Sequence, residues 1–199
     1  MDGMDEKTKR FRRQMDFLLE LDKVKLIGRQ TYLADGSRFE NDAEHSWHAA
    51  VMAVVLSEYF PKADLAKTMA MMLLHDVVEI YAGDTYCYDT VGYQDKDARE
   101  MAAAEKIYGL LPPDQREEMM ALWQEFEAGQ TEEAKFCAIL DRVQPTMLNH
   151  AQGGRSWVEH GIHKEQVEKR NAATFQGPDV IAAYMREIID TAYEKGVLK

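Results

Sequence analysis

Apolar residues recur at helical spacing along most of this 199-residue chain, and no segment shows a convincing strand pattern. The most apolar stretch is AKTMAMMLLHDVVEIYAGD, residues 66–84, which carries no charge from Thr68 to Leu74. Neither proline nor glycine interrupts it before Gly83, so we predict one buried helix. Pro61 is expected to open this helix, because proline is tolerated in the first helical turn.

The same pattern predicts helices on both sides of this stretch. Their expected ranges are about 6–26, 42–59, 96–110, 113–127, from 131 onward, 163–173 and 178–195. Asn41 and Glu44 match a capping box at the start of the second of these helices. Pro145 is expected to kink the helix that starts at residue 131. The pattern as a whole predicts an all-α protein.

Two segments are predicted to be loops. Residues 29–42 contain the turn signal Asp35-Gly36, and residues 151–161 are rich in glycine but do not match a phosphate-binding loop. We find no repeats, low-complexity tracts or linker, so a single domain is expected for a chain of this length.

Composition narrows the classes of function. A formal net charge of −11 argues against binding nucleic acid polymers or anionic membranes through bulk electrostatics. No apolar run approaches membrane-spanning length, and the polar N-terminus lacks the apolar core of a signal peptide. Cys87 and Cys137 are far apart and have no metal-binding spacing, which is typical of a reducing compartment. We therefore expect a cytoplasmic protein.

Four polar residues stand out because they lie within apolar helices: His45, His75, Asp76 and Asp141. Two imidazoles and two carboxylates suit a divalent Mn, Fe, Co, Ni or Zn ion. Glu79 follows His75 by four positions and Asp76 by three, so the three side chains share one side of a helix. The alternative is a hydrogen-bonded core histidine beside a helix-end acid.

The sequence around these residues resembles a known family. The segments AEHSWHAA, LLHDVVEIYAGD and AILDRVQP resemble the HD-domain metal-dependent phosphohydrolases, in the branch of the bacterial 5′-deoxynucleotidases and their eukaryotic relatives. The stretch LLPPDQREEMMALWQEFEAGQTEEAKFCAILD is also similar to that branch. The resemblance implies one HD-domain helical bundle over residues 1–199, with a metal-site core at about 42–150 and helices at 163–195 packed on it. It also implies a homodimer.

The resemblance further implies roles for individual residues. One divalent metal ion per chain would be held by His45, His75, Asp76 and Asp141. Glu79 matches the acid placed beside the attacking water, Asp84 a second acid that orients or protonates, and Arg29 an arginine near the phosphate of a nucleoside 5′-monophosphate substrate.

The chain departs from its relatives at one point and leaves alternatives open. Those enzymes carry an Arg-Trp pair that helps to select deoxyribose, whereas this chain has Arg29-Gln30. Lys25 and Arg38 are further phosphate candidates or ordinary surface charges. Trp157 and His160 either close over a base or simply pack.

Two other functions remain as alternatives. One is an HD phosphodiesterase or another hydrolase of small phosphoesters; the absence of histidine between His75 and His150 counts against the dinuclear site that such relatives use. The other is a non-catalytic module that binds a nucleotide.

Overall fold

The computed structural model describes residues 5–89 and 91–199, without the side chain of Tyr93. The α-helices are α1 (Glu6–Leu21), α2 (Asp42–Leu56), α3 (Leu65–Leu74), α4 (Glu79–Ala82), α5 (Lys96–Tyr108), α6 (Pro113–Ala128), α7 (Glu132–Ala151), α8 (Arg155–His160), α9 (Lys164–Arg170) and α10 (Asp179–Glu194). Short 3-10 helices cover Asp22–Leu26, Ser57–Tyr59, Gly92–Gln94 and Thr174–Gln176. The predicted all-α class is confirmed. Among the described helices, none is long and apolar enough to cross a membrane.

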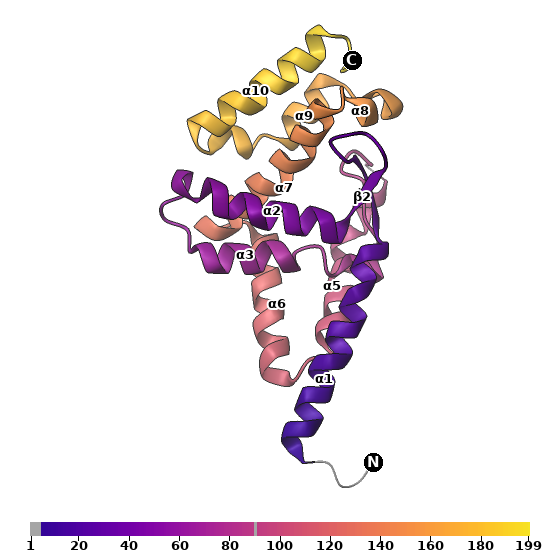
Figure 1. The fold of residues 1–199 in the computed structure, drawn as a ribbon, viewed down its shortest axis with the longest axis vertical. Coiled ribbons are helices and arrows are strands. Elements are labelled where there is room, and N and C mark those ends of the chain that lie inside the picture. The colour runs from indigo at the N-terminus through magenta and orange to yellow at the C-terminus, as the bar shows by residue number, and fades with distance from the viewer. Residues whose placement is uncertain (1–4, 90) are drawn as a thin grey trace.

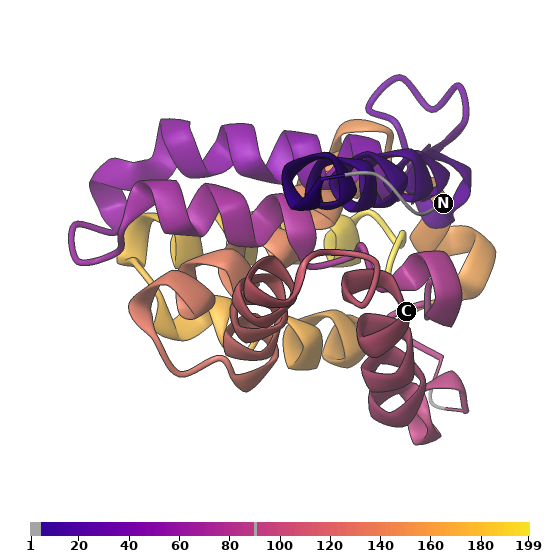
Figure 2. The same ribbon diagram turned by 90° about the horizontal axis from the view of Figure 1, so that it is seen from below.

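Helices α2, α3 and α7 form the centre of the molecule, with α2 and α3 side by side in both views (Figures 1 and 2). Their apolar faces meet in a first core that includes Ala49, Ala53, Met71, Met72, Phe136 and Leu140. Helices α1, α5 and α6 lie toward one end of the molecule and α8, α9 and α10 toward the other (Figure 1). The first group encloses a second core around Phe17, Ile107, Tyr108 and Trp123. The second group encloses a third core around Trp157, Val167, Ile188 and Ile189.

The predicted single helix over residues 66–84 is wrong. Helix α3 ends at Leu74, a series of turns follows, and the one-turn helix α4 begins only at Glu79. The backbone N–H of Glu79 bonds to the carbonyl of Asp76 at 3.0 Å, three residues back rather than four. Because of this break the segment packs into two cores: Met71 and Met72 belong to the first core, and the valines at 77 and 78 belong to the second. A helix that is apolar on all sides has no periodicity that could reveal such a break.

A two-stranded antiparallel sheet occupies part of the segment predicted as a loop. Strands β1 (Gly28–Tyr32) and β2 (Phe39–Asn41) pair with Tyr32 opposite Phe39, and these two rings stack at 4.1 Å. The turn at Asp35-Gly36 is present, with Gly36 at a φ of 70°. The strands are too short for their alternation to be visible in the sequence. The sheet contacts α7 and α8.

Two further helix boundaries differ from prediction. Helix α3 begins at Leu65, not at Pro61, because Asp64 caps it by accepting a hydrogen bond from the backbone N–H of Lys67. The glycine-rich segment 151–161 contains α8, which lies between Gly154 and Gly161, both in the left-handed conformation. The predicted capping box of Asn41 and Glu44 is present at the start of α2.

Candidate metal and catalytic site

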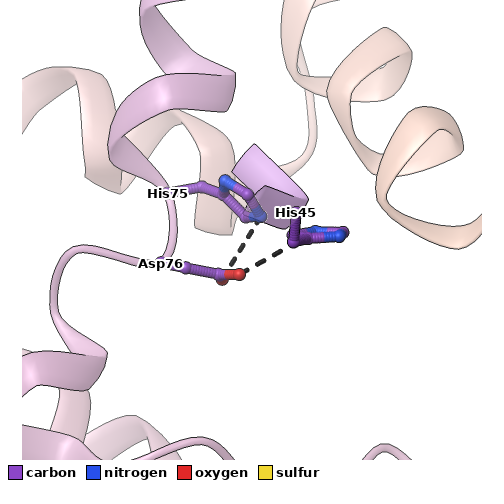
Figure 3. Close-up of side chains that lie close together, drawn as sticks. All are labelled: His45, His75 and Asp76. Carbon is purple, nitrogen blue, oxygen red and sulfur yellow. Dashed lines mark ion pairs between the residues drawn. The ribbon is translucent and has the colours of Figure 1, made fainter. Parts of the chain in front are cut away.

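The four predicted metal ligands converge from α2, the end of α3 and α7. His45 lies in the first turn of α2, His75 caps the C-terminus of α3, Asp76 follows it, and Asp141 lies in the middle of α7. The Nε2 atom of His45 is 3.2 Å from Asp141 Oδ1 and 3.8 Å from Asp76 Oδ2. The Nε2 atom of His75 is 3.2 Å from Asp76 Oδ1 (Figure 3). The break after α3 therefore presents His75 and Asp76 to the two longer helices.

Both imidazoles are held so that Nε2 faces the cluster. His45 Nδ1 lies 2.9 Å from the side-chain oxygen of Gln144, and His75 Nδ1 lies 2.8 Å from the carbonyl oxygen of Met72. These oxygens only accept hydrogen bonds, so each Nδ1 carries a proton and donates. Each Nε2 is buried and lacks a hydrogen-bond partner among the described residues. A core histidine would use both nitrogens, whereas a metal-binding histidine has this arrangement.

Each of the two carboxylates is oriented by an arginine. Arg29 donates to Asp76 Oδ2 at 2.7 Å, and Arg170 donates to Asp141 Oδ2 at 3.1 Å. Burial alone would raise the pKa of both acids, but the nearby charges of the histidines and of an arginine outweigh burial and hold the pKa of each below its usual value. Both are therefore carboxylates, each with an oxygen toward an imidazole.

The charges around His75 show how the site behaves without a cation. Burial lowers the pKa of His75, but the carboxylates of Asp76 and Asp141 outweigh this effect and raise it to about 9. A proton on His75 would thus take the place of a missing cation, and a metal ion would have to displace it. These donors fit a divalent transition metal.

A second group of acids adjoins the ligands. Oxygens of Asp42, Asp76 and Glu79 lie within 4.8 Å of one another. Glu79 is buried at the start of α4, and burial together with Asp76 and Asp42 raises its pKa well above the usual value. Burial and the charge of Asp76 likewise raise the pKa of Asp42 to about 7. Arg29 contacts this group too, with Nη1 3.3 Å from Asp42 Oδ1.

Three of the four predicted ligands, His75, Asp76 and Asp141, line a cavity of about 340 Å³, within the range of small-molecule sites. Asp84 lines it just after α4, and burial raises the pKa of this acid although Arg29 acts in the opposite direction. Gln30 and Trp157 line it as well. Trp157 is almost fully buried in the third core, so its main role is packing.

Two residues that were predicted as candidates for phosphate binding, Lys25 and Arg38, do not line this cavity. Lys25 pairs with Asp22, and Arg38 pairs with Glu44, both at the exposed surface. The ring of His160 lies 4.6 Å from that of Tyr86, which does line the cavity.

Four residues of this site were not predicted from the sequence: Glu40, Asp42, Gln144 and Arg170. Asp42 lies three positions before His45 on α2, and Gln144 lies three positions after Asp141 on α7. This spacing on one helix face could have identified both residues as neighbours of the ligands. Arg170 comes from α9, and only the tertiary structure places it beside Asp141.

Comparisons with known proteins identify relatives of this chain. A human protein named 5′-deoxynucleotidase HDDC2 is 31% identical over 131 residues, which cover 65% of this chain and 63% of that protein. Its mouse counterpart is 34% identical over 105 residues, covering 53% of this chain and 52% of that protein. The chain thus matches less than two thirds of the length of these relatives.

Solved structures give a longer match. The crystal structure of a protein described as a "Predicted metal-dependent phosphohydrolase" from Magnetospirillum magnetotacticum is 44% identical, covers 98% of this chain and 99% of that one, and superposes with a TM-score of 0.93. A Pyrococcus furiosus protein at 24% identity and a TM-score of 0.59, covering 90% of this chain and 99% of that one, shares the fold. The profile described as HD domain matches residues 21–179. The chain therefore belongs to the HD domain family.

Proposed function

We propose that this chain is a metal-dependent phosphohydrolase that converts nucleoside 5′-monophosphates, ribose or deoxyribose, to nucleoside and phosphate. One observation carries the proposal: two buried imidazole Nε2 atoms without hydrogen-bond partners among the described residues face the carboxylates of Asp76 and Asp141, and His75 and both carboxylates line a cavity. The names of the similar human and bacterial proteins support the reaction class.

The metal ion would be held by His45, His75, Asp76 and Asp141, one ion per chain. When bound, such an ion polarises a phosphoryl oxygen and lowers the pKa of a coordinated water. The donor set suits Mn, Fe, Co, Ni or Zn alike. Arg29 contacts both Asp76 and Asp42 and so places a cation beside the second group of acids, which supports one metal ion rather than two.

Glu79 and Asp84 would perform the proton transfers. Glu79 would accept the proton of the attacking water once a bound ion has offset the neighbouring negative charges that, with burial, raise its pKa. Asp84, on the cavity wall, delivers a proton to the alkoxide that leaves the phosphate. This assignment leaves two acids with opposite tasks on either side of one short helix, α4.

Arg29 would bind the phosphate while it orients Asp76. It lines the cavity, and its positive charge offsets the charge that develops on the phosphoryl oxygens. Gln30 follows it on the same wall. Because Gln30 stands where relatives have tryptophan, we expect weak discrimination between ribose and deoxyribose.

The proposal also covers the domain organisation and the oligomeric state of the chain. We propose one HD domain over residues 1–199, with the metal core at about 42–150 and the helices at 163–195 packed on it, acting as a cytoplasmic homodimer. Ile181 and Met185 of α10 join the core of α2, α3 and α7, which supports one domain. Large apolar side chains are exposed on the outer faces of α1 and α2, which supports self-association: Phe11, Met15, Leu18, Leu19, Trp47, Val51, Val54 and Val55.

The proposal is tested by assaying the purified, metal-reconstituted chain against ribo- and deoxyribonucleoside 5′-monophosphates, 3′-monophosphates, cyclic nucleotides and a phosphodiester. We expect metal-dependent phosphate release from 5′-monophosphates. Hydrolysis of diesters with inert monophosphates would identify a phosphodiesterase instead. Saturable nucleotide binding without turnover under any metal would identify a non-catalytic module.

A further inference from the structure

Asp84 lies on a segment with little regular structure of its own. Gly83, with a φ of 76°, ends α4 and turns the chain so that Asp84 and Thr85 line the cavity. The next α-helix, α5, begins only at Lys96. Such segments are usually mobile unless other contacts hold them, and proton transfer requires the acid within hydrogen-bond reach of its substrate.

Arg99, in the first turns of α5, makes these contacts. Its Nη1 donates to the carbonyl oxygen of Ala82 at 2.7 Å. Its Nη2 donates to Thr85 Oγ1 at 3.1 Å and to the carbonyl oxygen of Gly92 at 3.0 Å. Its Nε donates to Asp95 Oδ1 at 2.9 Å, which fixes the guanidinium itself. One side chain therefore bonds to four positions of the 82–95 connection.

These bonds lie on both sides of Asp84. Ala82 precedes Asp84 by two residues and Thr85 follows it by one, so a single planar group sets the distance between the flanking points. The carbonyl of Ala82 is also one of those at the C-terminus of α4 that lack a partner inside the helix. A guanidinium can satisfy several acceptors in a fixed geometry, which a lysine ammonium cannot reproduce.

The next part of the segment is anchored separately. Tyr86 and Tyr88 pack against the third core, around Trp157. Arg99 thus holds the segment on the side of α5, and the two tyrosines hold it on the side of α8 and α10. Without Arg99 the tyrosines would still attach the segment, but no other hydrogen-bonded side chain among the described residues would join Ala82 to Thr85.

We propose that Arg99 is a positioning residue that fixes Asp84 in the cavity. The inference rests on the proposed function, because the consequence of the positioning is catalytic only if Asp84 transfers the proton. It gives Arg99 no contact with substrate. Its loss is expected to lower kcat by roughly ten- to hundredfold, as small misplacements of catalytic groups do, and to leave KM within about twofold.

Amide hydrogen exchange tests the positioning without any assay of activity. Arg99→Met should accelerate exchange in peptides covering residues 83–92 by at least about tenfold. Arg10→Met is the matched control, since Arg10 makes two bonds to exposed Asp114 and does not line the cavity. Unchanged exchange in Arg99→Met overturns the proposal. If that variant does not fold, Arg99→Lys replaces it, and wild-type exchange in Arg99→Lys has the same meaning.

A double-mutant cycle tests the path through Asp84. In the Asp84→Asn background, Arg99→Met should reduce kcat little further, because the group that it positions is already lost. Loss of rate by the same factor in both backgrounds would overturn this part of the proposal. If the wild-type chain releases no phosphate from any monophosphate, the proposed function fails, and hydrogen exchange still decides whether Arg99 holds the segment.

Discussion

Gln144 offers the most direct test of how the metal site is built. It is fully buried in α7, accepts from His45 Nδ1 at 2.9 Å and donates to Glu40 Oε2 at 2.8 Å. Gln144→Met keeps the length of the side chain and removes both bonds, together with the longer 3.4 Å contact between Gln144 Nε2 and His48 Nδ1. The imidazole of His45 then loses the contact that fixes its protonation and its rotation, and Glu40 loses a donor.

Two effects of different size should follow. A buried polar group left without a partner costs about 1–3 kcal/mol, and more if charged, so two such groups should destabilise the metal-free protein by about 2–6 kcal/mol. Loss of a residue that orients a metal ligand weakens metal binding by roughly 10- to 100-fold. The stabilisation gained on adding metal should therefore fall by a further 1.4 to 2.7 kcal/mol or so.

Urea unfolding with and without metal measures the first effect, and competition with a chelating indicator measures the second. Gln130→Met is the control, since Gln130 is exposed and its amide donates to the carbonyl of Ala128. It should leave both quantities at wild-type values. A destabilised Gln144→Met protein that binds metal as tightly as wild type would show that Gln144 supports the core and does not orient His45.

The remaining predictions concern ligand roles, metal content and assembly. Glu79→Gln should keep its metal while the rate falls by roughly two to four orders of magnitude, whereas Asp141→Ala should lose metal and activity together. Elemental analysis and single-turnover kinetics distinguish the two outcomes. Loss of metal from Glu79→Gln would identify Glu79 as a ligand. Protein purified without chelator should carry about one equivalent of metal, and chelation should lower its melting temperature, whereas two tightly bound equivalents would contradict a mononuclear site. Light scattering at micromolar concentration should give the mass of a dimer, and a monomer mass would remove that proposal.

The ligand set could be found from the sequence because of a simple energetic constraint. Polar side chains within apolar helices are costly unless they are paired, so His45, His75, Asp76 and Asp141 were conspicuous against their neighbours. The structure brings these four together. Their roles stay a prediction until metal binding is measured.

The break after α3, which orients His75 and Asp76 toward the other ligands, could not be predicted from the sequence. Residues 66–84 are apolar on all sides, and the change from four-residue to three-residue hydrogen bonds after Leu74 leaves no mark on such a pattern. What causes it is the packing of one short segment against two different cores, which is a property of the tertiary structure. Arg170 escaped prediction for the same reason, since α9 reaches Asp141 only through the fold.

The excess of negative charge explains why a metal ion and this fold would depend on each other. In the described part of the cluster, two arginines, Arg29 and Arg170, lie near six acids: Glu40, Asp42, Asp76, Glu79, Asp84 and Asp141. Without a further cation, burial and the neighbouring acids raise the pKa values of Asp42 and Glu79, which favours their protonated forms. A divalent ion would supply the missing charge to ligands from α2, α3 and α7. Because these helices also form the first core, metal binding would stabilise the part of the molecule on which the others are packed.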